Sequence, residues 1–600
     1  MTRRPLPTRT LPPHPHLDQL KRQAKELLEA FRSGESAADT EVRAHYRGPD
    51  PATFALHDAQ LVLARAYGFE SWPKLKAFVD GATVQRLVES VRKNRIDEVN
   101  TLLSARPELA RMSADNLQVI HHAVLAGAPE MVRVLMAHGA DARQGVYPFP
   151  EATTAHAIAR QRGRDDIVRI IEDAEHSRRD ARSGRLPGEP AALHRAAFAL
   201  DRTEVARLLD EGADPNDRGY RGLTPADAVA YRWYRTDTRR AADIITLLLA
   251  RGAAMTPAAA VVLDDAAWLR ARHDEGALTN DLQDAGGLLR IAVTHDRARL
   301  LALLLDWGFD PDERIRFTPG DEPVEASWGM PLQAAVNLAR YDMAAALLER
   351  GADPNAAIYA SGDPVMAAYE RRDARMIALL ERYGGVPTAG TIGSFGPYDL
   401  ARRALDGDAP CRLEGNAASI AEQMLWGAAR EGRADVVALA LERLDWARDD
   451  PRWFSMLEQT LRHDSDPSVA SWDDSPHVTC LRLLLDRCDP NVRGRPTDRQ
   501  QFGLTALHAL VARGNLPPAE RRAFARALLD KGARLDVRDH LLKSTPLGWA
   551  CRWGHLPLVQ FFLEHGADPV EADAEAWATP LAWARHGGYD GIVEELERRA

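Results

Sequence analysis

The sequence predicts an all-α fold: a solenoid of helix–turn–helix repeats with loop or β-turn tips, preceded by a small helical region. The first observation is repetition, since residues 545–570 read TPLGWACRWGHLPLVQFFLEHGADPV and residues 579–600 read TPLAWARHGGYDGIVEELERRA. Thr545 and Thr579, which open the two segments, are 34 positions apart. The second observation is the length of 600 residues, which exceeds what one hydrophobic core usually organises and suits an elongated array.

Each unit carries the signals of two short helices. Thr545 can cap the first helix, and Pro546 suits its first position, where no amide donor is needed. The second helix has a wide apolar stripe, as in residues 558–563, which a helix packed between two neighbouring units requires. Glycines are then expected to end the second helix in a left-handed cap, at Gly139, Gly212, Gly351, Gly532 and Gly566.

Further copies lie upstream. Residues 193–216 read LHRAAFALDRTEVARLLDEGADPN and residues 332–355 read LQAAVNLARYDMAAALLERGADPN, with another copy at 115–142. These segments resemble ankyrin repeats, which have a period of about 33 residues and a T-P-L-H-x-A signature. The resemblance implies that a partner docks on the concave surface made by the hairpin tips and the first helices.

The residues before the repeats form a different region. Residues 17–82 predict amphipathic helices, in segments such as LKRQAKELLEAFRSG and AQLVLARAYGFESWPKLK. This region resembles a helical region that precedes the repeats in some bacterial ankyrin proteins, and no function follows from that resemblance. Residues 1–16 combine prolines with Arg3, Arg4 and Arg9 and no acid, so we expect a disordered tail.

Polar stretches with glycine and proline divide the array. We predict repeats at 83–175, 191–386 and 419–600, separated by a linker at 176–190 and an irregular break at 387–418. Whether the stack continues through the two breaks stays open. A terminal repeat needs a polar outer face, and the last helix offers Glu594, Glu595, Glu597, Arg598 and Arg599.

Composition excludes several classes of protein. The formal net charge of -10 gives no drive toward nucleic acid or an anionic membrane, which favour basic surfaces. No apolar run of about 18 residues exists, so no membrane span is predicted. The four cysteines form no C-x-x-C pair and are sparse for a disulfide framework, which predicts reduced thiols in the cytoplasm. Export by a dedicated system stays an open alternative.

Histidine is the residue that most invites a catalytic or metal-binding interpretation. His121, His156, His194 and His508 recur at the H of T-P-L-H, where we expect them to bond the backbone of the adjacent loop. No phosphate-binding loop, G-x-S-x-G or H-E-x-x-H motif occurs. The HPH at 14–16 has no third ligand. We therefore predict no catalytic residue, no cofactor, no metal and no small-molecule substrate.

The most unusual surface segment is residues 218–240, RGYRGLTPADAVAYRWYRTDTRR. Tyr, Trp and Arg dominate binding hot spots, and basic-aromatic mixtures also suit single-stranded nucleic acid. The alternative is that this expanded loop folds its aromatics onto its own repeat. We predict contact with a protein partner rather than nucleic acid, through Tyr220, Arg221, Tyr231, Trp233, Tyr234, Arg235 and, in the loop after a GADPN turn, Tyr359.

Tryptophans gather in the last two repeats, at Trp549, Trp553, Trp577 and Trp583. We expect them to pack in the core, and an exposed aromatic strip is the alternative.

The function predicted is a non-catalytic protein–protein scaffold. Contact is expected at the loops after each helix pair: 214–223, 310–328, 353–363, 489–504 and 536–545. Three alternatives stay open: an effector or toxin-related protein in which the N-terminal region acts and the repeats target it, an enzyme, and a self-associating structural protein.

Overall fold

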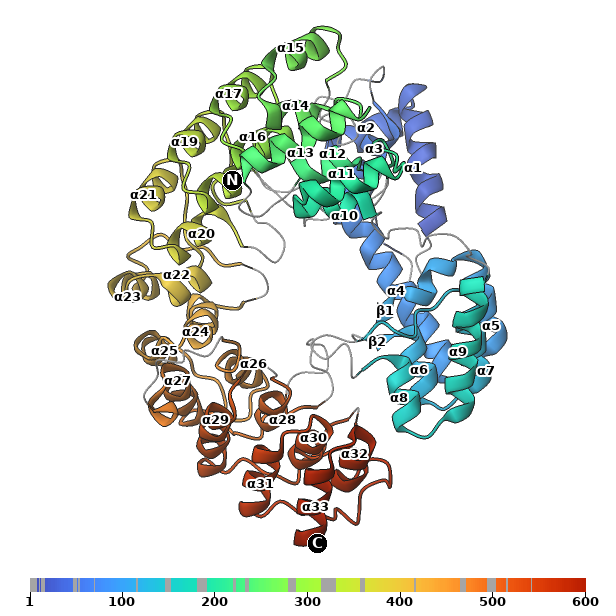
Figure 1. Cartoon of the computed structure of the whole chain (residues 1–600), viewed down its shortest axis with the longest axis vertical. Helices are drawn as coiled ribbons and strands as arrows, with labels where there is room; N and C mark the ends of the chain where they lie inside the picture. The colour runs from blue at the N-terminus through green and yellow to red at the C-terminus, as the bar shows by residue number, and fades with distance from the viewer. Residues whose placement is uncertain are drawn as a thin grey trace.

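The computed structural model describes residues 8–9, 11, 17–46, 51, 54–69, 71–114, 117–145, 153–180, 192–218, 223–231, 237–278, 287–313, 331–356, 362–414, 417–463, 471–493, 503–513, 516–540 and 542–600. Over these residues the chain is an all-α solenoid, as predicted. The first helix of each pair lies on the inner side of a curved array and the second on the outer side (Figure 1). The array curls round so that the end of the first repeat segment, near residue 160, approaches the last repeats of the chain.

The N-terminal unit consists of α1 (Leu17–Arg32), α2 (Ser36–His45), α3 (Leu56–Ala66) and the first half of α4 (Trp72–Arg92). Its small core includes Phe31 against Phe54, whose ring centroids lie 4.7 Å apart. Arg9 donates to both carboxylate oxygens of Glu41 at 2.6 and 2.7 Å. This ion pair ties the segment before α1 to α2.

Helix α4 crosses the predicted boundary at 82/83 without a break. Leu75 and Val79 pack in the core of the N-terminal unit, whereas Leu87 and Val91 pack in the core of the repeats. The predicted boundary lies between these two cores and within the helix, because a repeat motif marks where the repeated pattern begins, not where a helix ends. One continuous helix therefore belongs to both units.

The first repeat segment has a short hairpin at its first tip, where β1 and β2 pair antiparallel. Arg178 donates to the carbonyl oxygen of Ala140 at 2.9 Å and also bonds that of Met136, at the end of the preceding outer helix. The last helix therefore extends into the predicted linker at 176–190 and covers that end. The elements are α5 (Ile96–Ala105), a 3-10 helix (Pro107–Arg111), β1 (Ser113–Ala114), β2 (Leu117–Gln118), α6 (Val119–Leu125), α7 (Pro129–Ala137), α8 (Ala155–Gln161) and α9 (Asp165–Asp180).

The second segment continues the pairs in regular alternation. Its helices are α10 (Ala192–Ala199), α11 (Arg202–Asp210), α12 (Pro225–Ala230), α13 (Thr238–Ala250), α14 (Pro257–Leu263), α15 (Ala266–Asp274), α16 (Leu288–Thr294), α17 (Ala298–Asp306), α18 (Pro331–Asn337), α19 (Tyr341–Glu349), α20 (Pro364–Glu370) and α21 (Ala374–Arg382).

The region 387–418, predicted to be irregular, contains a helix pair, so that prediction differs from the structure. The pair joins the second segment to the third. From there the helices are α22 (Ala389–Phe395), α23 (Tyr398–Asp406), α24 (Ile420–Arg430), α25 (Ala434–Leu441), α26 (Arg452–Gln459), α27 (Pro476–Leu485), α28 (Ala506–Val511), α29 (Pro518–Asp530), α30 (Pro546–Arg552), α31 (Leu556–Glu564), α32 (Pro580–Gly587) and α33 (Asp590–Arg599), with a 3-10 helix at Trp472–Asp474.

Glycines explain why 387–418 misled the sequence analysis. A Cβ at Gly393 of α22 would overlap the carbonyl oxygen of Met424 in α24, and a Cβ at Gly427 would overlap that of Gly390. These glycines let the two helices approach closely, whereas a glycine-rich sequence is otherwise typical of a loop.

The predicted helix signals are confirmed. Thr545 Oγ1 accepts a hydrogen bond from the amide of Gly548 at 3.1 Å, and Thr579 Oγ1 accepts one from Ala582 at 3.1 Å. The five predicted glycine caps all have left-handed backbone, with φ of +93° at Gly139, +89° at Gly212, +94° at Gly351, +91° at Gly532 and +89° at Gly566. The helices therefore begin and end where local chemistry demands.

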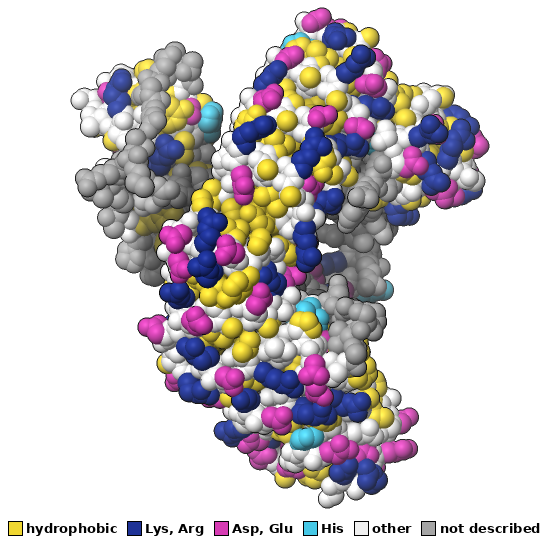
Figure 2. Space-filling model, turned by 90° about the vertical axis from the view of Figure 1, so that its left-hand side faces the viewer, with side chains coloured by type: hydrophobic (Ala, Val, Ile, Leu, Met, Phe, Trp, Pro, Cys, Tyr) yellow, Lys and Arg dark blue, Asp and Glu magenta, His cyan; other side chains and the backbone are white. Residues whose placement is uncertain are grey.

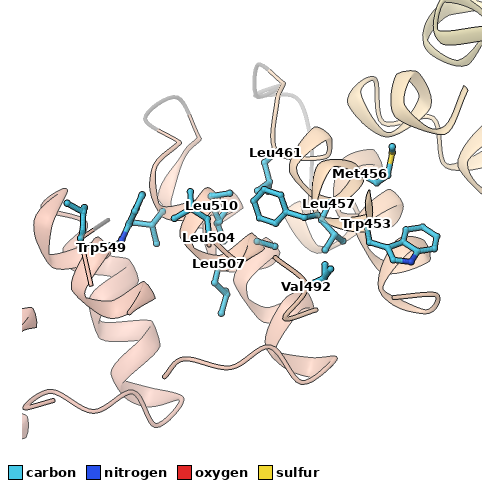
Figure 3. Close-up of a cluster of buried hydrophobic side chains, with 14 of the residues drawn as sticks. Trp453, Met456, Leu457, Leu461, Val492, Leu504, Leu507, Leu510 and Trp549 are labelled. Atoms are coloured by element: carbon cyan, nitrogen blue, oxygen red, sulfur yellow. The ribbon is translucent and has the colours of Figure 1, made fainter. Parts of the chain in front are cut away.

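The core of the third segment runs along the inner helices. Figure 3 shows Trp453, Leu457, Leu507 and Trp549 from α26, α28 and α30 in a row across successive units. Trp549 and Trp583 are each 1% exposed, which confirms the core-packing interpretation for these two.

The buried residues form two large blocks that do not follow the chain order. One block covers residues 193–380. The other combines residues 84–171 with residues 389–596. The first segment of the chain therefore shares its core with the last segment.

Candidate functional site

Histidines hold neighbouring units in register. The Nε2–H of His121, His194 and His508 donates to a carbonyl oxygen of the next loop, at 2.8 Å to Thr153, 2.9 Å to Leu223 and 3.1 Å to Ser544. The predicted backbone bond is confirmed at these three positions. At the fourth position the prediction is wrong, because His156 Nε2 instead meets a carboxylate oxygen of Glu172 at 2.9 Å.

Asparagines of the Asp-Pro-Asn turns form a second link between units, which the sequence analysis missed. Asn216 Nδ2–H donates to the carbonyl of Gly252 at 2.8 Å, and its Oδ1 accepts from the amide of Ala254 at 2.7 Å. Asn355 and Asn491 repeat this pair of bonds with the following unit. The signal was in the sequence, since Asp-Pro-Asn occurs at 214–216, 353–355 and 489–491.

Ion pairs connect the outer helices. Asp210 pairs with Arg251 and Asp306 pairs with Arg350, each at 2.5 Å and each across adjacent units. Figure 2 views the outer side and shows charged side chains of both signs spread over it, with hydrophobic side chains between them. Exposed pairs of this kind contribute about 0–1 kcal/mol each to the free energy of unfolding, so they are a minor part of the stability of the stack.

The inner helix α24 carries an exposed aromatic side chain. Trp426 is 36% exposed, and the Arg430 guanidinium lies 5.7 Å from its ring centroid. One turn earlier, Gln423 exchanges two hydrogen bonds with the backbone of Glu414, at 2.9 and 3.2 Å. Those bonds hold the preceding tip against α24, where Leu413 is 49% exposed.

Neighbours and outer helices cover the other sides of α24. Helices α22 and α26 flank it and α25 lies outside it, so its free side faces the interior of the curve (Figure 1). Every residue of the inner helices α16 and α28 is buried, by contrast. Trp426 and Arg430 therefore stack on the inner helix α24, and Leu413 lies on the tip that Gln423 holds against the same helix.

Most of the predicted contact residues fall outside the described part of the chain. These are Tyr220, Arg221, Trp233, Tyr234, Arg235 and Tyr359. Tyr231 is described, and it is 5% exposed and packed in the core of the second segment. The structure thus gives the Tyr231 side chain a packing position, and the contact role of the other six stays a prediction.

Where the predicted contact loops are described, their side chains often bond neighbouring tips. Arg538 donates to both carboxylate oxygens of Asp573, at 2.7 and 2.8 Å, and to Glu571 at 3.0 Å. Thr545 donates to Glu571 from the opposite side, at 2.5 Å. These charged side chains therefore form bonds that hold neighbouring tips in register.

A buried polar cluster lies beside Tyr231. Arg290 is 3% exposed, and its Nη1 lies 3.5 Å from the carbonyl oxygen of Tyr231. Its backbone amide donates to Glu313 Oε1 at 3.0 Å. Burial raises the pKa of Glu313 to about 8 and lowers that of Arg290 to about 10. Glu313 is therefore largely protonated at neutral pH.

The thiols have the character of packing groups. Cys480, Cys488 and Cys551 are buried and free, and burial raises the pKa of Cys480 and of Cys488 to about 12. Among the described residues, no group of three or more His, Cys, Asp or Glu side chains is arranged to hold a metal ion.

The repeat geometry agrees with a comparison of families. Residues 469–573 match the family model described as ankyrin repeats, in three copies. This part of the chain consists of ankyrin repeats. The wider array, with the same helix pairs and the same histidine and asparagine links, continues that ankyrin architecture on the N-terminal side.

Relatives resemble this chain over short stretches. Human "Ankyrin repeat domain-containing protein 63" is 37% identical over 121 residues, 20% of this chain and 30% of the relative. Mouse "Palmitoyltransferase ZDHHC13" is 44% identical over 100 residues, 16% of this chain and 15% of the relative. "Palmitoyltransferase Hip14" of Drosophila melanogaster is 47% identical over 55 residues, 9% of each chain.

The matched stretches thus cover less than a third of each of these relatives. All three relatives are animal proteins, and they lend no support to the likeness to bacterial ankyrin proteins. No helix in the described part of the chain is long and apolar enough to cross a membrane.

Proposed function

We propose that this chain is a non-catalytic, cytoplasmic scaffold that binds a protein partner on the inner face of its ankyrin array. The observation that carries the proposal is the group formed by Leu413, Trp426 and Arg430, which we call the inner patch. It combines a large aromatic, an aliphatic and a stacked guanidinium, the residue types on which binding energy concentrates. The free thiols favour the cytoplasm.

Trp426 and Leu413 of the inner patch are exposed, whereas every residue of the inner helices α16 and α28 is buried. Exposed Trp and Leu side chains cost solvation free energy that a partner would recover on contact. The amphipathic indole, with a polar N–H at one edge, suits a protein surface better than a uniform apolar one.

The test is affinity capture of the partner from the native cell with the full chain and two alanine variants. We expect Trp426→Ala to lose the partner, with a cost above 1 kcal/mol in binding free energy. Tyr398→Ala is the matched control, because Tyr398 is an aromatic of 47% exposure on the adjacent outer helix α23. Equal retention of the partner by all three proteins would contradict the inner face as the binding surface.

A second candidate function is an effector in which the N-terminal unit acts and the repeats target it. Its support is that this unit has small cores of its own, around Phe31 and around Leu20. The fragment that tests it must end beyond Arg92, because α4 is shared. Activity or toxicity retained by residues 1–95, with no contribution from Trp426, would favour this candidate over the scaffold.

A further inference from the structure

The end of the first repeat segment, at α8, lies beside the last repeat of the chain, at α32 (Figure 1). In a stack that followed the chain order, the whole second segment would separate these two repeats. The contact between them therefore needs its own physical cause.

One side chain makes this contact directly. The Arg162 guanidinium, just after α8, lies over the Trp577 ring at 4.8 Å from its centroid. Trp577 is half-buried, and its Nε1–H donates to Glu575 at 2.6 Å, which fixes the orientation of the ring. A guanidinium over an indole face is the favoured geometry for a cation–π interaction.

The charges around Arg162 support the same placement. Burial lowers the pKa of Arg162, while the carboxylates of Glu575 and Asp539, both on C-terminal tips, favour its charged form. Burial lowers the pKa of the His586 imidazole in α32, and the charge of Arg160, two residues before Arg162, lowers it further. Two elements of the last repeat therefore face the end of α8.

The hydrophobic core gives an independent observation. Buried residues 84–171 form one block with residues 389–596, and not with residues 193–380 that come next in the chain. The contact therefore joins the buried residues of the first segment to those of the last.

We propose that Arg162 and the tip Glu575–Trp577 form an intramolecular clasp that closes the ankyrin array on itself in solution. The clasp goes beyond partner binding, because it determines the curvature of the inner face that a partner would contact. It exists whether or not the inner patch binds a partner.

The test measures the distance between the end of the first segment and the last repeat by double electron–electron resonance on the full chain. Spin labels are placed at Asp173→Cys in α9 and Glu594→Cys in α33, both exposed positions, with Cys411→Ser to remove the one half-buried thiol. We expect one narrow population of distances in this parent. Arg162→Ala should shift it to longer and broader distances, and Trp577→Leu should do the same while keeping apolar bulk.

Arg169→Ala is the matched control, because Arg169 is exposed on α9 and bonds only within its own helix. It should leave the distances unchanged, and circular dichroism should show that every variant keeps its helices. A broad distribution in the parent would overturn the closed array. Distances that stay unchanged in both Arg162→Ala and Trp577→Leu would overturn the clasp.

Discussion

Individual side chains determine how one repeat meets the next. The histidine bonds link a first helix to the loop of the next unit, and the asparagine bonds link a turn to the backbone of the next unit, so both act at the contact between neighbouring repeats. Each buried polar group that loses its partner costs about 1–3 kcal/mol. These residues therefore report on the coupling between units.

We expect Asn355→Asp to lower the free energy of unfolding by about 1–2 kcal/mol. The carboxylate keeps the acceptor for the amide of Val386, at 2.8 Å, but loses the donor to Gly384 and places a negative charge beside that carbonyl. Urea unfolding followed by circular dichroism measures the change. Asn337→Asp, at an exposed position on α18, is the control and should stay within 0.5 kcal/mol or so of the parent.

Glu313 gives the protein a specific pH dependence. Its pKa of about 8 in the folded chain lies above its ordinary value of 4.5, so the native state binds the extra proton. Stability from this group is present below pH 4.5 and is lost as pH rises toward 8. We expect Glu313→Gln, which keeps the acceptor for the Arg290 amide, to become more stable relative to the parent as pH increases from 5 to 8.

Urea midpoints of the two proteins at several pH values test this expectation. Buried histidines act in the opposite sense, because burial lowers the pKa of His508 to about 4 and removes stability as pH falls below 6.5. The comparison of Glu313→Gln with its parent cancels that contribution. A difference that does not change with pH would show that Glu313 titrates normally.

Sequence chemistry predicted much at the residue scale and little about the contact site. Thr545, His508 and Gly566 act locally, so their roles follow from the motif. Trp426 and Leu413 carry no such signal, since their exposure depends on which neighbours cover α24. Tyr231 was predicted to contact a partner because tyrosine is common in binding hot spots, whereas the packing of the second segment buries this side chain.

At the scale of elements, the pair α22 and α24 is the closest inner contact and depends on missing side chains. We expect Gly393→Ala to cost about 1–3 kcal/mol, because the new methyl group would overlap the carbonyl of Met424. Gly390→Ala in the same helix is the control: its methyl would sit 3.5 Å from Gln423 in ordinary contact. Thermal unfolding should separate the two, and an equal effect of both changes would contradict the close-approach argument.

Helix positions were predictable from periodicity and caps, but helix lengths were not always. Helix α9 continues to Asp180 because Arg178 finds carbonyls at the end of α7. Helix α4 runs through the predicted boundary because its first half packs in the core of the N-terminal unit and its second half packs in the core of the repeats. Tertiary contacts decide such cases, and a single sequence does not display them.

At the scale of the whole molecule, α4 fixes the N-terminal unit to the repeats. We expect hydrogen exchange to be slow without interruption from about residue 76 to residue 91, since each amide in a continuous helix is bonded four residues back. Mass spectrometry of peptides that span 80–84 measures this. Fast exchange confined to those residues would show two units joined by a flexible hinge.

The closed arrangement could not be predicted from the sequence. Arg162 and Trp577 belong to different repeats more than 400 positions apart, and neither occupies a motif position that specifies the other. The repeat motif determines the fold of each unit and its packing against its immediate neighbours. The contact between the first segment and the last repeats depends on the summed curvature of all the units.

The shared core of residues 84–171 and 389–596 has a consequence for biosynthesis. The ribosome releases the early repeats first, while the segment that completes their core lies more than 200 codons downstream. At about 5–20 residues per second, the early repeats wait roughly 10–40 s for it. During that interval their uncovered apolar face is a natural substrate for chaperones, and shortening the intervening repeats would shorten the exposure.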